Sequence, residues 1–237
     1  MPTLILDIET IGEEFDLMDK VTQKDLTKRI RQESSGEAEL ETKLQDLKDE
    51  LVFSPLTGEV VAVGVLDSEK EKGVVYFRAD EAKQKIKPKV LDGVELKQVK
   101  DERDMLEKFW EGASKYDTFV TYNGRGFDVP YLWARSAKYG ISPTVDLMTS
   151  RYLSLQRGAK HIDLMDLLSF YGANWKKGSL HQWCRLFDIK SPKGDGVSGD
   201  DVTQLFRDKK YQEIAEYNAR DIIATNELFK KWREFYS

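Results

Sequence analysis

The first apolar stretch of the chain carries two acidic residues at its end. In MPTLILDIETIG, Asp7 and Glu9 follow leucines and isoleucines typical of a buried strand. Residues two apart on a strand face the same side, so both carboxylates are presented to one place. A carboxylate removed from water must be neutralised, paired or bound to a cation. Oxygen ligands suit Mg²⁺ and Mn²⁺, and two such ions about 4 Å apart can stabilise both the attacking and the leaving oxygen of phosphodiester hydrolysis.

Two later stretches carry further acids, and each stretch alone is only weak evidence for a functional site. In TYNGRGFD, a strand ends at an Asn-Gly turn and Asp128 follows, where capping of the next helix is the simpler interpretation. In YNARD, Tyr217 and Asp221 lie four residues apart and therefore on one helical face. Such short patterns are common by chance, so the information lies in the conjunction and order of the three stretches.

In this order the three stretches resemble the exonuclease motifs of the DEDDy branch of DnaQ-like 3′–5′ exonucleases, within the ribonuclease H-like fold. The similarity is greatest to predicted bacterial exonucleases related to the proofreading domain of family-B DNA polymerases. It extends into HIDLMDLLSFYG and SPKGDGVSGDDV. The resemblance implies that two divalent cations, Mg²⁺ or Mn²⁺, bind four carboxylates, and that a tyrosine assists them. Position by position, these catalytic residues fall on Asp7, Glu9, Asp128, Tyr217 and Asp221.

The resemblance also implies a substrate and a reaction. We expect hydrolysis of single-stranded nucleic acid, DNA before RNA, from the 3′ end to nucleoside 5′-monophosphates. Tyr217 is expected to orient the attacking water, because an ordinary tyrosine pKa of about 10 does not suit a general base. Phe127 suits a core position as well as a base-stacking one. The expected substrate contacts are Thr10, Ile11, Asn123, Phe127 and Lys193.

The composition is that of a soluble globular protein. The chain is 40% hydrophobic and 33% charged, with a formal charge of −5. Its length of 237 residues predicts one domain over residues 1–237. A single cysteine excludes an internal disulfide, and we find neither a secretory signal pattern nor an apolar run of bilayer length. We therefore expect a cytoplasmic protein without a membrane segment. Any polymerase or repair partner is expected to be a separate protein.

The elements that must position these residues form a mixed α/β pattern. β-branched runs predict a hairpin of strands over 60–66 and 73–77, and TFVTYNG predicts another strand. Helices are expected over 101–115, 130–139, from Asp163 onward, over SLHQWCRLF, and over 202–207 and 209–235. The predicted fold is a ribonuclease H-like mixed sheet flanked by helices.

Residues 13–51 are highly charged and depart from the minimal core. Leu40, Leu44, Leu47 and Leu51 recur at helical spacing, which predicts a helical hairpin broken near residues 34–36. An insert packed on its own domain is the simpler interpretation, and a partner-binding coiled coil is the alternative.

Two other functions remain open at this level. A protein of the same fold that has lost catalysis would only bind nucleic acid, and an endonuclease of the same fold would cut internally. The presence of all five catalytic positions disfavours the first alternative. The Tyr-x-x-x-Asp stretch disfavours the second.

Overall fold

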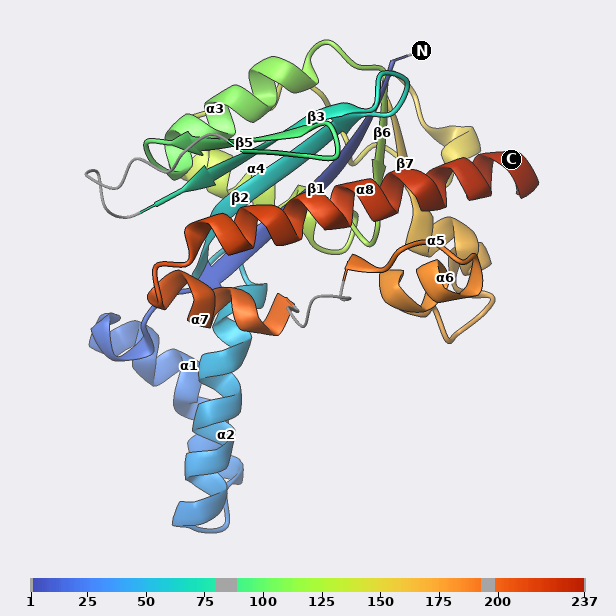
Figure 1. The fold of residues 1–237 in the computed structure, drawn as a ribbon. Helices are drawn as coiled ribbons and strands as arrows, with labels where there is room; N and C mark the ends of the chain where they lie inside the picture. Colours follow the sequence, from blue (N-terminus) through green and yellow to red (C-terminus); the bar gives the residue numbers. More distant parts are fainter. Residues whose placement is uncertain (1, 80–88, 193–198, 237) are drawn as a thin grey trace.

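The computed structural model describes residues 2–79, 89–192 and 199–236, which form a mixed seven-stranded sheet with helices on both faces (Figure 1). The strand order is β4-β5-β3-β2-β1-β6-β7. β1 pairs antiparallel with β2 and parallel with β6, so it lies where the sheet changes direction. The strands are β1 (Thr3–Gly12), β2 (Gly58–Asp67), β3 (Lys72–Arg78), β4 (Lys89–Leu91), β5 (Val94–Val99), β6 (Thr118–Thr121) and β7 (Lys160–Asp163).

Helices form one layer on each face of this sheet. The long helix α8 (Tyr211–Phe235) crosses one face, with α5 (Leu164–Leu168), α6 (Leu180–Leu186) and α7 (Val202–Arg207) on the same side. The helices α3 (Glu102–Ala113) and α4 (Asp128–Lys138) cover the other face. The architecture is therefore the mixed sheet flanked by helices that the sequence predicts.

The two faces of β1 bury different residues. Leu4, Leu6 and Ile8 belong to the core under α3 and α4, whereas Ile5 belongs to the core under α8. Because side chains alternate along a strand, Asp7 and Glu9 share the face of Ile5. The alternation thus places both acids beneath α8.

The insert between β1 and β2 is a helical hairpin, α1 (Lys20–Glu33) and α2 (Glu37–Glu50), that projects from the end of β1 (Figure 1). The predicted break is present, since α1 ends before Ser34 and α2 begins after Gly36. The side chain of Asp19 caps α1 by accepting from two backbone N–H groups. Leu51 is buried beyond the end of α2 and fixes the base of the hairpin to the core.

Local signals predicted most of the other helices and the β2–β3 hairpin. Asp163 caps α5 as expected, and α7 has the predicted bounds. The expected strand TFVTYNG ends at Thr121, and α4 begins at Asp128, two residues before the predicted start. The sequence interpretation also overlooked β4 and β7, which have three and four residues, and β5, which has six.

One local signal in this overlooked region was available. Asp92 and Gly93 have φ of +47° and +86° between β4 and β5, and Asp-Gly between apolar residues is a strong signal of a tight hairpin. In the described part of the chain, no helix combines the length and the apolar composition needed to cross a bilayer.

Candidate metal centre and active site

Three acidic side chains from two distant parts of the chain meet beneath α8. Asp7 and Glu9 come from β1 and Asp221 comes from α8, and one carboxylate oxygen from each lies within 4.8 Å of the other two. Glu9 and Asp221 are buried and Asp7 is half-buried. The structure therefore brings together three of the four predicted metal ligands, and we call them the acidic cluster.

Asp128, the fourth predicted ligand, lies beside the acidic cluster. It is the first residue of α4, and its Oδ1 accepts a hydrogen bond from the backbone N–H of Ile8 at 3.0 Å. The helix-capping interpretation is wrong, because Phe127 occupies the cap position and Asp128 bonds to β1 instead. This bond holds the carboxylate next to the strand that carries Asp7 and Glu9.

A residue that the sequence interpretation overlooked joins the acids. The side-chain amide of Asn218 donates to Asp7 Oδ2 at 2.7 Å and to Glu9 Oε1 at 3.5 Å. Asn218 is fully buried on α8, and its amide oxygen has no hydrogen-bond partner among the described residues. Its position three residues before Asp221, on the same helical face, was the available signal.

Gly64 on β2 makes room for this asparagine. A Cβ atom built on Gly64 would lie 2.1 Å from Asn218 Oδ1, which is far inside van der Waals contact. Gly64 pairs with Asp7 across the β1–β2 ladder. The glycine is therefore required where the sheet, α8 and the acidic cluster approach one another most closely.

The acids resist ionisation in the absence of a cation. Burial raises the pKa of Asp7 well above its ordinary value, and the charges of Asp128, Asp221 and Glu9 raise it further. The pKa of Glu9 rises for the same reasons, while the hydrogen bond from Asn218 opposes both shifts. Burial, opposed by backbone hydrogen bonds, raises the pKa of Asp128 to about 7.

The donor set fits a hard divalent cation. All of the donor atoms are carboxylate oxygens, and no thiol or imidazole belongs to the acidic cluster. In the described part of the chain, neither Asp7 nor Glu9 forms an ion pair with a protein cation. A bound divalent cation would replace the mutual repulsion by attraction and lower these pKa values.

Tyr217 lies on the same helix, one turn before Asp221, and its side chain is buried. Burial raises the pKa of Tyr217, as do the neighbouring carboxylates of Asp221, Glu9 and Asp7. A side-chain hydrogen bond with Asp221 adds to this shift, so the phenol remains protonated and is a poor base.

The predicted substrate contacts on β1 are partly engaged within the protein. The Thr10 hydroxyl is buried and donates to the carbonyl of Val52 at 3.1 Å. Ile11 is half-buried and packs against the core under α8. The end of the hairpin insert is thus bonded directly to the strand that carries the acids.

The second motif places its predicted contacts at a rigid turn. Asn123 is half-buried with φ of +66°, and its backbone N–H donates to Asp163 Oδ1 at 3.0 Å. Phe127 is half-buried, with its ring centroid 5.4 Å from that of Tyr131 and 6.5 Å from that of Phe53. Lys193, the remaining predicted contact, lies outside the described residues.

Phe53 was not anticipated as a neighbour of this motif. It ends the insert, and its side chain is 58% exposed although its ring meets the edge of Phe127. It is an exposed aromatic residue that extends the surface beside Phe127. Only its place in LVFSP, directly after the insert, marked it in the sequence.

Histidine and cysteine chemistry has no place in this arrangement. His161 is buried with its ring nitrogens bonded to the Thr121 hydroxyl and the Leu147 carbonyl, and burial lowers its pKa to about 4. Cys184 is buried in α6, where burial and the charge of Asp221 raise its pKa to about 11. Both residues are structural.

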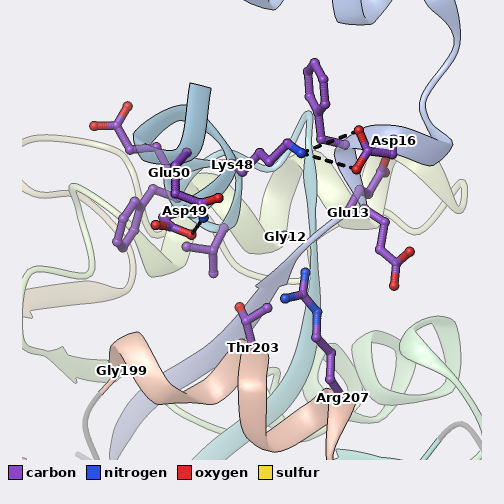
Figure 2. A pocket seen from close by; sticks show the side chains of 14 residues that line it. Gly12, Glu13, Asp16, Lys48, Asp49, Glu50, Gly199, Thr203 and Arg207 are labelled. Atoms are coloured by element: carbon purple, nitrogen blue, oxygen red, sulfur yellow. Dashed lines mark hydrogen bonds and ion pairs between the residues drawn. The ribbon is translucent and has the colours of Figure 1, made fainter. Parts of the chain in front are cut away.

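A cavity of about 720 Å³ lies between the root of the hairpin and α7. Figure 2 shows Thr203 and Arg207 on α7 facing the end of β1 at Gly12, with Lys48 and Asp16 joined by an ion pair on the hairpin side. Two cations face five acids here. The acids are Glu13, Glu14, Asp16, Asp49 and Glu50. The cavity is therefore acidic.

Comparison with known proteins agrees with the resemblance of the three motifs to 3′–5′ exonucleases. Residues 72–236 match the family described as "Predicted 3'-5' exonuclease related to the exonuclease domain of PolB". A DNA polymerase of Methanocaldococcus jannaschii is 40% identical over 75 residues, or 28% of this chain and 5% of that protein. A DNA polymerase of Thermococcus litoralis is 22% identical over 191 residues, or 74% of this chain and 10% of that protein.

The fold comparison agrees with the sequence comparisons. The structure of the family B DNA polymerase from Pyrobaculum calidifontis matches with a TM-score of 0.60 and 18% identity, over 99% of this chain and 25% of that one. This likeness confirms the ribonuclease H-like α/β fold. The chain thus spans a quarter or less of each of these polymerases.

Proposed function

The chain belongs to the family of predicted 3′–5′ exonucleases related to the exonuclease domain of PolB, and on that premise we propose that it hydrolyses single-stranded DNA from the 3′ end with the help of divalent cations. The products are nucleoside 5′-monophosphates. The observation that carries the proposal is the meeting of Asp7, Glu9 and Asp221 in a buried place, with Asp128 beside them.

Four carboxylates would bind the two proposed cations. Asp7, Glu9 and Asp128 would hold one ion with Asp221 completing the set, and Asp7 would hold the other together with substrate phosphate oxygens. When bound, Mg²⁺ or Mn²⁺ supplies Lewis-acid stabilisation of the attacking and leaving oxygens. Asn218 fixes the orientation of the Asp7 and Glu9 carboxylates through its amide group.

Tyr217 positions the attacking water. Its phenol stays protonated because burial and the nearby carboxylates raise its pKa. It therefore donates or accepts a hydrogen bond at the water without removing a proton itself. Asn123, Phe127, Thr10 and Ile11 border the place where the terminal nucleotide lies.

The direct test uses 5′-labelled single-stranded DNA and RNA oligomers with Mg²⁺, Mn²⁺ or EDTA. We expect a ladder of products shortened from the 3′ end, loss of all activity in EDTA, and faster hydrolysis of DNA than of RNA. Undiminished activity in EDTA would contradict the metal mechanism.

A covalently closed single-stranded circle separates this function from its alternatives. An exonuclease leaves the circle intact, whereas an endonuclease of the same fold opens it. Binding of the linear oligomer without hydrolysis under any ionic condition would identify a catalytically silent binding module.

A further inference from the structure

The loop before α6 exposes an aromatic residue that two lysines follow. Residues 173–178, here called the tryptophan loop, contain Trp175, whose side chain is 79% exposed. Lys176 Nζ lies 5.1 Å from the centroid of the Trp175 ring, and Lys177 follows. Tryptophan is highly buried on average in folded proteins, so full exposure leaves a large stacking surface in water.

The tryptophan loop is bonded to the second motif of the candidate active site. The Tyr122 hydroxyl donates to the carbonyl of Gly178 at 2.8 Å, and Tyr122 directly precedes Asn123. The indole N–H of Trp183 on α6 donates to the carbonyl of Lys177 at 2.9 Å. Gly178 has φ of +76°, a conformation that favours glycine. These bonds hold the base of the loop in place.

Helix α6 links the loop to the acidic cluster. Cys184 follows Trp183 on this helix and lies close enough to Asp221 for that carboxylate to raise its pKa. The rings of Trp183 and Phe187 stack with centroids 6.0 Å apart, and both residues pack against the core under α8. The tryptophan loop therefore borders the candidate active site on the side of Tyr122 and α6.

Two adjoining hollows run from Asn123 to the tryptophan loop. The first, of about 310 Å³, is lined by Asn123, Arg125, Arg151 and Lys177 among others. The second, of about 430 Å³, is lined by Lys176, Lys177, Gly178, Gln182, Trp183 and Leu186. Lys177 lines both, so the two hollows adjoin at this residue.

The charge along these two hollows favours an anion. The second hollow has two lysines and no acid among its lining residues. In the first, Asp166 is paired with Arg151, and Asp163 accepts backbone N–H groups of Asn123 and Arg125. The cavity at the hairpin root presents five acids and two cations instead. A polyanion that leaves the acidic cluster is therefore attracted to the tryptophan loop and repelled from the hairpin root.

We propose that the tryptophan loop binds the single-stranded nucleic acid upstream of its 3′ end, with a base stacked on Trp175 and backbone phosphates at Lys176 and Lys177. Base–aromatic stacking beside a cationic groove is the general means of holding a single strand without reading its sequence. The inference rests on the proposed function, since that function places the 3′ end at the acidic cluster.

Binding of a labelled single-stranded oligomer, measured by fluorescence anisotropy in EDTA, tests the loop without any hydrolysis. Trp175→Ala should weaken binding about tenfold, and Trp175→Phe should retain most of the affinity because it keeps a stacking ring. Lys177→Ala should reduce the slope of log K against log salt by about 0.7, the value for one phosphate contact on a single strand.

The chain offers a matched control at the end of α8. Phe235 is 64% exposed, and Lys231 Nζ lies 5.7 Å from its ring centroid, which reproduces the exposed aromatic and lysine of the loop. Phe235→Ala and Lys231→Ala should leave binding unchanged. Equal affinities of wild type, Trp175→Ala and Lys177→Ala would overturn the inference, as would the absence of any binding by wild type.

Hydrolysis of two substrates separates this inference from the proposed function. In Mg²⁺, Trp175→Ala should raise KM for a long oligomer and leave kcat/KM for a dinucleotide unchanged, because a dinucleotide does not reach the loop. Wild-type binding that depends on Trp175 without any hydrolysis would contradict the proposed function and support the loop. If wild type hydrolyses the long oligomer and Trp175→Ala has the same KM, the result would contradict binding by the tryptophan loop and support the proposed function.

Discussion

Buried carboxylates occur on both faces of the sheet, and the two sets differ in the hydrogen-bond and ion-pair partners that compensate their burial. On the α3–α4 face, Glu102 is 1% exposed and accepts hydrogen bonds from Arg135 Nε at 2.8 Å and Nη2 at 2.6 Å. It also accepts from the Tyr139 hydroxyl and the Val60 backbone N–H, each at 2.8 Å. On the α8 face, the one side-chain donor among the described residues that bonds to both Asp7 and Glu9 is the Asn218 amide.

The contrast distinguishes a carboxylate compensated within the protein from the set that we propose to bind cations. The chain itself supplies the cation and the donors that compensate the burial of Glu102. The acidic cluster gathers like charges where Glu9 and Asp221 are buried and Asp7 is half-buried, an arrangement that a bound cation would make more favourable. This difference in compensation, more than the presence of acids, is what supports a metal site at Asp7 and Glu9.

The largest expected effect removes a charge from the acidic cluster. Asp7→Asn should lower kcat by about 10³-fold or more, because Asp7 serves both proposed ions and a metal contributes several kcal/mol to the transition state. In EDTA the variant should be no less stable than wild type, since the substitution relieves repulsion. Hydrolysis rates and thermal melts check both statements.

The matched control for this change is Asp16→Asn, which removes an exposed acid that is paired with Lys48 at the hairpin root. It should leave kcat unchanged. Wild-type turnover by Asp7→Asn would show that the active site lies elsewhere.

The opposite behaviour is expected on the other face. Arg135→Met leaves Glu102 buried without its cation and should reduce the free energy of unfolding by about 3 to 5 kcal/mol. Adding Glu102→Leu should recover part of the loss, because it removes the uncompensated charge. Urea unfolding of both variants, with and without Mg²⁺, makes the measurement. If Arg135→Met were as stable as wild type, or if Mg²⁺ restored its stability, the two sets of carboxylates would not differ in the way described.

A smaller effect is expected from Tyr217→Phe. The change removes only the hydroxyl that orients the water, so the single-turnover rate should fall about 10²-fold, at the lower end of the usual range for a positioned group. The affinity for Mn²⁺ should stay the same because the four carboxylates are intact. Single-turnover kinetics and Mn²⁺ titrations provide the two numbers. A parallel loss of Mn²⁺ affinity would make the tyrosine a structural residue.

The smallest effect, counted per pH unit, is the pH dependence of stability without metal. An unfolded aspartate titrates near 4, whereas folded Asp128 keeps its proton up to a pKa of about 7. The stabilisation from the retained proton is therefore fully present below about pH 4 and is lost as the pH rises through 7. Its slope is at most about 1.4 kcal/mol per pH unit for each retained proton.

Urea unfolding of wild type and Asp128→Asn in EDTA isolates this contribution. Asparagine keeps an oxygen for the Ile8 N–H but does not titrate, so the stability of wild type should fall relative to the variant between about pH 4 and about 7. Saturating Mg²⁺ should abolish or reverse the difference. A pH-independent difference in EDTA would contradict the raised pKa of Asp128.

Features that depend on neighbouring residues were predictable from the sequence. The helix break at residues 34–36, the Asp163 cap and the α7 bounds all follow from local spacing and side-chain capping. The order of the three motifs was sufficient to identify the family. Short strands such as β4 and β7 escaped prediction, because three or four residues carry too little periodic signal.

Contacts between distant residues were decided by the tertiary structure alone. Asn218 lies 211 residues from Asp7 in the chain, and only the crossing of α8 over β1 places its amide on the two carboxylates. In the same way, the bond from Ile8 to Asp128 replaced the expected helix cap. The sequence by itself determined which residues carry acids and in which elements they lie. Burial and mutual repulsion, which support the proposed cation site, arise only when the packed layers bring those acids together and bury them.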